Sequence, residues 1–532
     1  MEESQTTKVA ESGSESGSLI KEREAAKANR TNRQVTVAIL IGIAVYVLLL
    51  FAGVVPEAHL AAPDAAQAGH VEPSHGEIQF IPSIWAVLPF VSLLLAIAIL
   101  PLVPATEHWW HHNRNRFLVA TVLGIVTLTY YGIVHPGGIE NHLTHSPPSH
   151  AGLGTVAAVF SNAIFSEFIP FIILLFSLYV ISGGINLRGD LPAYPRINCL
   201  FLGAGALLAS FIGTTGAAML LIRPLLSTNA ERQHKVHTVV FFIFIVCNCG
   251  GLLLPIGDPP LFLGYLRGVP FTWTLRLWPY WLAVNVVLLT FYYFWDRVMY
   301  SREKIRAIVR DEAVIRPLAF SGHVNTVFLL GVVILVAFVI PGKSFLGTPL
   351  ETPLFLREIL MLVLVIASLQ LTKTEVRVRN RFEYHAIIEV AALFSGIFLC
   401  MQVPVEILQV KGSSLGIDTP RSFFWATGLL SSFLDNAPTY VVFFETAKAL
   451  PGKAASTLIE LGDGDSILES YLAAISLAAV FMGANTYIGN GPNFMVKSIA
   501  EQAGVKMPSF FGYMGYSMLI LVPVWIALTF LV

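Results

Sequence analysis

Asn248-Cys-Gly-Gly-Leu-Leu-Leu-Pro-Ile-Gly-Asp-Pro-Pro260 is a polar string, rich in glycine and proline, inside an otherwise apolar chain. A second string in the other half, Gly483-Ala-Asn-Thr-Tyr-Ile-Gly-Asn-Gly-Pro-Asn493, has a similar composition. A bilayer core offers no water to backbone amides, so such breaks persist at mid-membrane only where they line a polar cavity or are buried in protein. Paired breaks of this kind are typical of the binding sites of membrane transporters.

The composition of the chain indicates a membrane protein. Of its 532 residues 55% are hydrophobic and 13% are charged, whereas an average soluble domain has about 25% charged residues. The net charge of −1 gives no basic stripe, so we expect no nucleic-acid partner. The cysteines lie in or beside apolar runs, which predicts no disulfide framework; they are Cys199, Cys247, Cys249 and Cys400.

Apolar runs follow one another along the chain. The first, from Val35 to Val55, exceeds a typical signal-peptide core, so we expect an uncleaved helix, although the Ala-rich stretch 61–68 leaves cleavage open. We therefore predict an all-α polytopic membrane protein with about 11 transmembrane helices. The other runs are 84–103, 117–134, 156–181, 238–254, 278–295, 326–340, 359–371, 386–403, 471–482 and 510–532.

Two further apolar segments have a polar kink in the middle, at Gly213-Thr-Thr-Gly216 and at Asp435-Asn-Ala-Pro-Thr439. A single helix would break there at mid-membrane, so we interpret each segment as a re-entrant hairpin. Charge placement supports this topology, because a cytoplasmic N-terminus then leaves all but eight of the 33 lysines and arginines on the cytoplasmic side.

The predicted topology is an inverted repeat in which two hairpin tips and two broken helices meet near the bilayer midplane. The expected parts are a disordered cytoplasmic tail (1–33), a first helix with an outer loop (34–80), a first repeat (81–297), a basic cytoplasmic linker (298–321) and a second repeat (322–532). The hairpins are expected at 198–226 and 422–450, and the broken helices at 238–268 and 469–500.

The chain after residue 80 resembles the ion transporter superfamily. The first broken-helix string is similar to that of the NhaD-type sodium/proton antiporters and ArsB-type arsenite permeases, and Phe433-Leu-Asp-Asn-Ala-Pro-Thr439 resembles their second hairpin tip. The superfamily also includes citrate and dicarboxylate carriers. The resemblance implies scaffold and transport units, a homodimer in the lipid of the inner (cell) membrane, and elevator-like movement.

The first tip differs from the antiporter-like members. Those members often have an acidic Asp-Asn pair where this chain has Gly213-Thr214. The hydroxyls of Thr214 and Thr215 are closer to the tips of carboxylate carriers. The substrate therefore stays open between a cation and a carboxylate.

Two aspartates are the main candidate ion-binding residues. A carboxylate at membrane depth is costly, which suits a group that exchanges a proton for a cation, and Asp435 has Asn436 and Thr439 beside it as neutral oxygen donors. Asp435 is also placed to cap the returning half-helix. For Asp258 two roles stay equally open: it caps the half-helix that follows the first break, or its side chain faces the transport cavity.

Neutral groups of the breaks, and two glutamates, complete the predicted site. The uncharged groups can coordinate Na⁺ or hydrogen-bond a carboxylate; they are Asn248, Asn485, Thr486, Asn490 and Asn493. Glu389 and Glu167 are candidate proton relays, and for Glu167 a structural role near the outer boundary is an equal alternative. We expect no resident cofactor or metal beyond transported or coupling Na⁺ and H⁺.

Three transport functions follow from these residues. The leading hypothesis is sodium/proton antiport, and the alternative is Na⁺- or H⁺-coupled transport of citrate or another carboxylate; arsenite efflux is the third. An enzyme is not predicted, because the chain has no Ser-His-Asp pattern, HExxH helix or phosphate-binding glycine loop.

Overall fold

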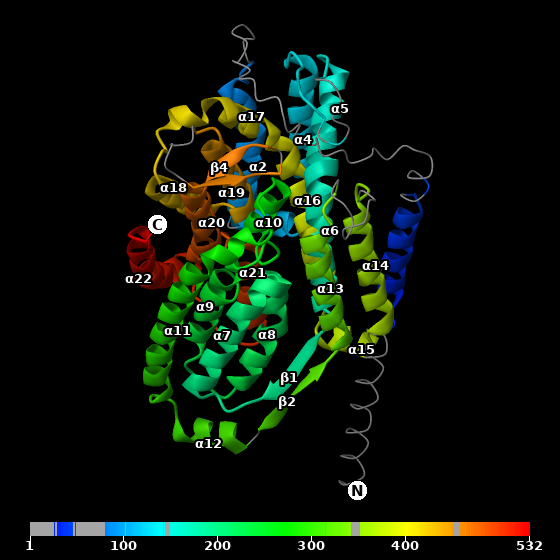
Figure 1. The fold of residues 1–532 in the computed structure, drawn as a ribbon. Coiled ribbons are helices and arrows are strands. Elements are labelled where there is room, and N and C mark those ends of the chain that lie inside the picture. Colours follow the sequence, from blue (N-terminus) through cyan, green and yellow to red (C-terminus); the bar gives the residue numbers. More distant parts are fainter. Residues whose placement is uncertain are drawn as a thin grey trace.

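The computed structural model describes residues 26, 29–45, 48, 80–101, 103–141, 143, 149–313, 315–341, 352–450, 457–462 and 464–531. The predicted tail (1–33) lies mostly outside the described residues, as does most of the outer loop before residue 80. Residues 29–45 are helical, so the predicted first helix begins several residues earlier than its apolar run. The described fold is helical, with two small two-stranded sheets (Figure 1).

The first half of the chain contains, in order, a series of helices, a pair of packed helices (α7 and α8), an interrupted helix (α9 to α10) and a long final helix (α11). The bounds are η1 (Ile84–Val87), α2 (Leu88–Ile99), α3 (Pro104–Trp110), α4 (Asn113–Ile133), α5 (Leu153–Ser161), the π-helix η2 (Asn162–Phe168), α6 (Ile169–Ser182), α7 (Pro195–Ile212), α8 (Thr214–Thr228), α9 (Val236–Ile245), η3 (Cys249–Leu252), α10 (Pro259–Leu266), η4 (Trp273–Leu277) and α11 (Trp278–Tyr300).

The second half repeats this order of elements. Its bounds are α13 (Val324–Phe338), α14 (Leu356–Leu371), α15 (Thr374–Arg379), α16 (His385–Cys400), α17 (Gln402–Lys411), η6 (Gly412–Leu415), α18 (Pro420–Phe433), α19 (Asn436–Lys448), α20 (Glu469–Met482), η7 (Gly483–Asn485), α21 (Gly491–Gln502) and α22 (Phe510–Thr529). Each half thus runs through helices, a helical hairpin, an interrupted helix and a final helix.

Several helices are long and apolar enough to span a membrane. In the described part of the chain five meet this description, or up to seven if each of two bent helix pairs is one span. Other predicted spans form shorter apolar helices, including Val236–Leu252 and Val324–Phe338. The helices identify a membrane protein, because a soluble fold rarely repeats apolar helices of this length.

Both kinked segments fold into pairs of helices that pack against each other. α7 and α8 meet at Gly213, whose φ of +78° lies in the region that favours glycine, and α18 and α19 meet at Leu434 and Asp435. Both helix pairs lie in the segments that the sequence interprets as re-entrant hairpins, and their re-entrant position in a membrane stays a prediction.

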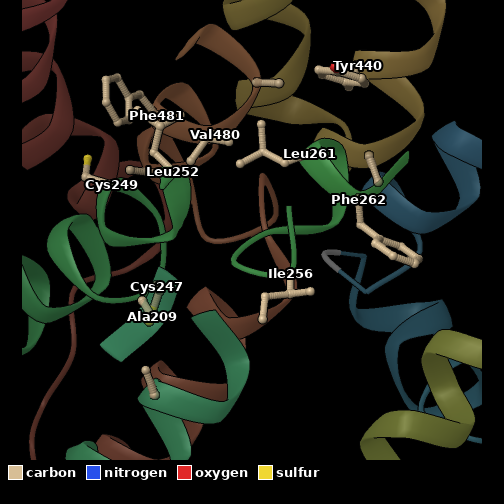
Figure 2. Packing of buried hydrophobic residues seen from close by; sticks show 14 of the residues in the cluster. Ala209, Cys247, Cys249, Leu252, Ile256, Leu261, Phe262, Tyr440, Val480 and Phe481 are labelled. Atoms are coloured by element: carbon tan, nitrogen blue, oxygen red, sulfur yellow. The ribbon is translucent and has the colours of Figure 1, made fainter. Parts of the chain in front are cut away.

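Apolar side chains surround both breaks at the centre of the molecule. α9 and α20 are buried over almost their whole length, and the cluster that contains them includes residues from both hairpins. Figure 2 shows this packing, with Ala209 of α7 near Cys247, and Leu252 near Val480 and Phe481. The polar residues of the breaks therefore lie inside an apolar shell that joins the two halves.

Two small sheets were not predicted from the sequence. β1 (Asn186–Asp190) pairs antiparallel with β2 (Arg316–Ser321), so the expected linker contains a strand, in addition to α12 (Ile305–Ala313). β3 (Leu458–Glu460) pairs with β4 (Ser466–Leu468) just before α20. The first sheet connects the linker to the segment that leads into the first hairpin, and such short strands give little periodic signal.

Candidate functional site

Each broken helix restarts at a polar residue that follows a glycine. Asp258 is the N-cap of α10, with φ −144° and ψ 144°, and Asn490 is the N-cap of α21, with φ −153° and ψ 139°. Both precede a proline-containing first turn, which suits a helix start because proline needs no amide partner there. Asp258 and Asn490 therefore hold matching positions in the two halves.

Two glycine pairs allow the backbone to fold back at the breaks. A Cβ on Gly257 would lie 2.2 Å from the carbonyl oxygen of Gly251, and a Cβ on Gly489 would lie 2.6 Å from that of Gly483. Real Cβ atoms do not approach oxygen this closely, so larger residues would displace the backbone. These contacts fix the position of Asp258 and Asn490, each of which directly follows the second glycine of its pair.

The carboxylate of Asp258 accepts hydrogen bonds from three other segments. Thr214 Oγ1 and Asn490 Nδ2 donate to Oδ1 over 2.9 and 3.1 Å, and Asn436 Nδ2 donates to Oδ2 over 2.6 Å. We call these four residues the Asp258 cluster. Each member is at most 3% exposed, so the cluster is shielded from solvent.

The Asp258 cluster brings together the N-terminal ends of four helices. Thr214 begins α8, Asn436 begins α19, and Asp258 and Asn490 precede α10 and α21. Helix N-termini carry partial positive charge and unpaired amides, so they stabilise an anion between them. Within the described residues Asp258 forms no ion pair with a lysine, arginine or histidine, and its negative charge is held by neutral donors alone.

Asn436 has one polar atom without a partner. Its Nδ2 donates to Asp258, whereas its Oδ1 is buried and accepts no hydrogen bond within the described residues. A buried acceptor without a partner costs free energy, which a bound cation or a donor on a ligand would recover. Asn436 Oδ1 is therefore the buried acceptor of the cluster that has no donor among the described residues.

Asp435 caps the second hairpin helix, as one of its two predicted roles requires. Its Oδ1 accepts a hydrogen bond from the backbone N–H of Ala437 over 3.1 Å. The carboxylate is half-buried and close enough to Asp258 to act on it electrostatically. Thr439 Oγ1 donates to the carbonyl oxygen of Asp435 over 3.0 Å, so this hydroxyl supports the turn. Thr215 is half-buried next to Thr214.

Three asparagines form a network that braces the breaks against each other. Asn248 Nδ2 donates to Asn493 Oδ1 over 2.8 Å, and Asn490 Nδ2 lies 3.2 Å from Asn248 Oδ1. Asn493 Nδ2 donates to the carbonyl oxygens of Gly483 and Thr486, each over 2.9 Å. The polar atoms of Asn248 and Asn493 are thus used within the protein.

The remaining predicted residues of the second break are also paired inside the fold. Asn485 Nδ2 donates to Ser432 Oγ over 2.8 Å, and its Oδ1 accepts from Trp525 Nε1 over 3.0 Å. Thr486 Oγ1 donates to the carbonyl oxygen of Ser432 and accepts from the backbone amides of Ile488 and Gly489. Both side chains stabilise the loop that positions Asn490.

The two glutamates predicted as relays form ion pairs of their own. Glu389 lies 2.7 Å from Arg116, and Glu167 lies 2.9 Å from Arg267, which also pairs with Glu445 over 3.2 Å. No described contact connects either glutamate to the Asp258 cluster. A relay function for both remains a prediction.

Sequence reasoning left out residues that only the fold identifies. Arg267 joins η2 to the end of α10 and to α19, and Ser432 connects the second hairpin to the second break. A serine precedes the tip of each helix pair, Ser210 in the first half and Ser432 in the second, and this repeated position could have been noticed in the sequence. Ser210 makes the equivalent contact to the first break, because its Oγ donates to the carbonyl oxygen of Gly250 over 2.6 Å. No comparable pattern in the sequence indicates that Arg267 pairs with two glutamates.

Residues 80–532 match the profile of a family described as "Putative citrate transport". The search of curated proteins found no match. The matched range contains both hairpins, both breaks and every member of the Asp258 cluster.

Proposed function

The chain belongs to this citrate transport family, within the ion transporter superfamily, and we propose that it carries citrate or a related carboxylate together with a coupling cation. The coupling cation is H⁺ or Na⁺. The protein is thus a secondary active transporter, and the Asp258 cluster is its central binding site. The sequence alone favoured sodium/proton antiport, and the family match now gives citrate at least equal support.

The observation that carries this proposal is the position of one buried carboxylate between four helix N-termini. Asp258 supplies the negative charge that a proton or Na⁺ would neutralise, and the Oδ1 atom of Asn436 supplies a free oxygen ligand for Na⁺. A buried charge held only by neutral donors is costly, so cation binding is favoured.

Cation binding prepares the same place for a carboxylate. Once Asp258 is neutralised, Thr214 and Asn436 no longer have to donate to a negative charge. Their hydroxyl and amide groups are then available to donate to a substrate carboxylate. The backbone amides in the first turns of α8 and α19 add a positive potential that attracts this anion. Because the anion binds after the cation, both cross the membrane together in the same direction. The cation gradient then drives the transport of the carboxylate.

Sodium/proton antiport is a second candidate, favoured by the proximity of Asp435 to Asp258. A carboxylate that acts electrostatically on another carboxylate favours binding of a proton or a cation there, because two like charges destabilise each other. In this mechanism the same pair alternately binds Na⁺ and H⁺.

The placement of the protein in the membrane is part of the proposal. We propose the inner (cell) membrane, a cytoplasmic N-terminus, two inverted repeats and a homodimer. The distribution of lysine and arginine supports the orientation, and the repeated order of elements supports the two repeats. The resemblance to the superfamily supports the dimer.

Purified protein in liposomes distinguishes the two functions. Labelled citrate is added outside under an imposed Na⁺ or H⁺ gradient, and a trapped dye reports internal pH. Citrate uptake that depends on one gradient supports the first proposal. Proton movement on Na⁺ addition without citrate supports antiport, and the absence of both would contradict this assignment of the site.

A further inference from the structure

A basic cavity lies at the opposite ends of two helices that form the Asp258 cluster. It has a volume of about 480 Å³ and lies between the C-terminal parts of α8 and α21 and the end of α15 with the residues after it. Its cationic lining residues are Arg223, Lys235, Arg379 and Arg381. Arg223 is nine residues from Thr214, which is about 13 Å along a helix.

Two of these four cations have no hydrogen-bond or ion-pair partner for their side chains in the part of the chain that the structure describes. Within the described residues the guanidinium groups of Arg223, which is half-buried, and of Arg381, which is exposed, form no hydrogen bond and no ion pair. The ionisable group that acts most strongly on Arg223 is another cation, Arg381. Arginines held together without a carboxylate repel each other, and an anion between them would remove that repulsion.

Structural roles account for the other two cations. Lys235 Nζ donates to the carbonyl oxygens of Asn229 and Ala230 over 3.0 and 2.9 Å, and so stabilises the C-terminal end of α8. Arg379 pairs with Glu375 over 3.2 Å at the exposed surface. Neither role applies to Arg223, which lies before the last turn of α8 and contacts no carbonyl oxygen in the described residues.

We propose that this cavity binds a small polycarboxylate anion, of the citrate class, held by Arg223 and Arg381. The volume suits a small ligand, and arginine forks match carboxylates in two-point hydrogen bonds. The inference rests on the proposed function, because it assigns a second position to the same substrate. On the side that the charge distribution assigns to the cytoplasm, the cavity would concentrate the anion near the far end of α8.

A thiol-protection experiment tests the cavity directly. Ser227→Cys places a thiol at an exposed position on its lining, and Ser301→Cys places one at an exposed position outside it. Full-length protein in phosphatidylcholine nanodiscs is labelled with uncharged N-ethylmaleimide, with citrate replacing chloride at constant ionic strength. We expect citrate to slow labelling of Ser227→Cys in a saturable way and to leave Ser301→Cys unchanged.

The charge variants decide whether the arginines hold the anion. Arg223→Gln with Arg381→Gln should remove the protection, whereas Arg306→Gln, an exposed change on α12, should preserve it. Absence of protection in the otherwise unchanged protein, or protection that survives the double change, overturns the proposal. The labelling is repeated in nanodiscs that contain phosphatidylglycerol. If this lipid protects Ser227→Cys and citrate does not displace it, the cavity binds a lipid phosphate and the proposal is overturned.

The experiment separates this inference from the proposed function. Labelling requires no transport, so protection of Ser227→Cys can be measured in the Asp258→Asn variant. Retained protection with lost uptake supports the cavity and the central site separately. Citrate protection in a protein that never transports citrate would support the cavity and reject the proposed function.

Discussion

Asn490 donates a hydrogen bond to Asp258 over 3.1 Å, although the two residues hold equivalent positions in the two broken helices. The two side chains differ in charge, since Asp258 is a carboxylate and Asn490 is a neutral amide. Two carboxylates at these positions would repel each other across a buried gap, whereas an amide opposite a carboxylate supplies a donor. The difference between the halves therefore places a carboxylate opposite an amide at the point where the two breaks meet.

We expect Asp258→Asn to abolish cation-coupled transport and to preserve membrane insertion. The amide has nearly the same shape but cannot exchange a proton or neutralise Na⁺. Uptake into liposomes and the yield of folded protein measure the two effects. Asp418→Asn, at an exposed position, is the matched control, and normal coupled uptake by Asp258→Asn would remove this carboxylate from the mechanism.

Asp435 is expected to be required for coupled transport beyond its role as a cap. Asparagine caps helices as well as aspartate does, whereas alanine loses about 1 kcal/mol at an N-cap. Asp435→Asn should therefore keep the thermal stability and abolish coupled transport, and Asp435→Ala should lose both. Thermal unfolding and liposome uptake are measured on the same preparations. If Asp435→Asn transports normally, the side chain serves only as a cap.

Gly257→Ala should impair transport through the backbone. The added Cβ would lie 2.2 Å from the carbonyl oxygen of Gly251, so the break would shift and carry Asp258 with it. Gly251→Leu should do the same, because a Cβ there would lie 2.7 Å from Thr214 Cγ2. Gly491→Ala is the control, since nothing lies within 4 Å of its Cβ position. Uptake and thermal unfolding compare the three variants, and equal behaviour would show that the breaks tolerate larger residues.

Asp296→Asn should destabilise the protein without changing the central site. Asp296 is fully buried and pairs with Arg232 over 2.6 Å and with His237 over 2.8 Å. Removing one partner of a buried ion pair leaves an uncompensated charge and costs about 3–5 kcal/mol. Thermal unfolding should show this loss, and the neighbouring exposed change Arg297→Gln should not. An unchanged midpoint for Asp296→Asn would mean that Arg232 finds another partner or water.

The polar segments that supply the Asp258 cluster were identifiable from the sequence, but the contacts within the cluster were not. Asp258, Thr214, Asn436 and Asn490 all lie in the polar strings that the sequence singles out. The sequence emphasised Asp435, whose cap contact is local, and left Asp258 between two roles. The decisive bonds from Asn436 and Asn490 to Asp258 join residues 178 and 232 positions apart. No local pattern encodes the direction of such contacts.

The sequence by itself determined that this is a helical membrane protein, and it located two kinked apolar segments and two interrupted helices. Hydropathy and the backbone preferences of glycine and proline are local properties, so they can be read from the chain directly. The tertiary structure alone decided that Asp258 is the shared acceptor, that Asn248 and Asn493 bond to each other, and that Arg223 and Arg381 line one cavity. Those outcomes depend on how distant helices pack, because packing sets which polar atoms have partners and which stay free to bind a ligand.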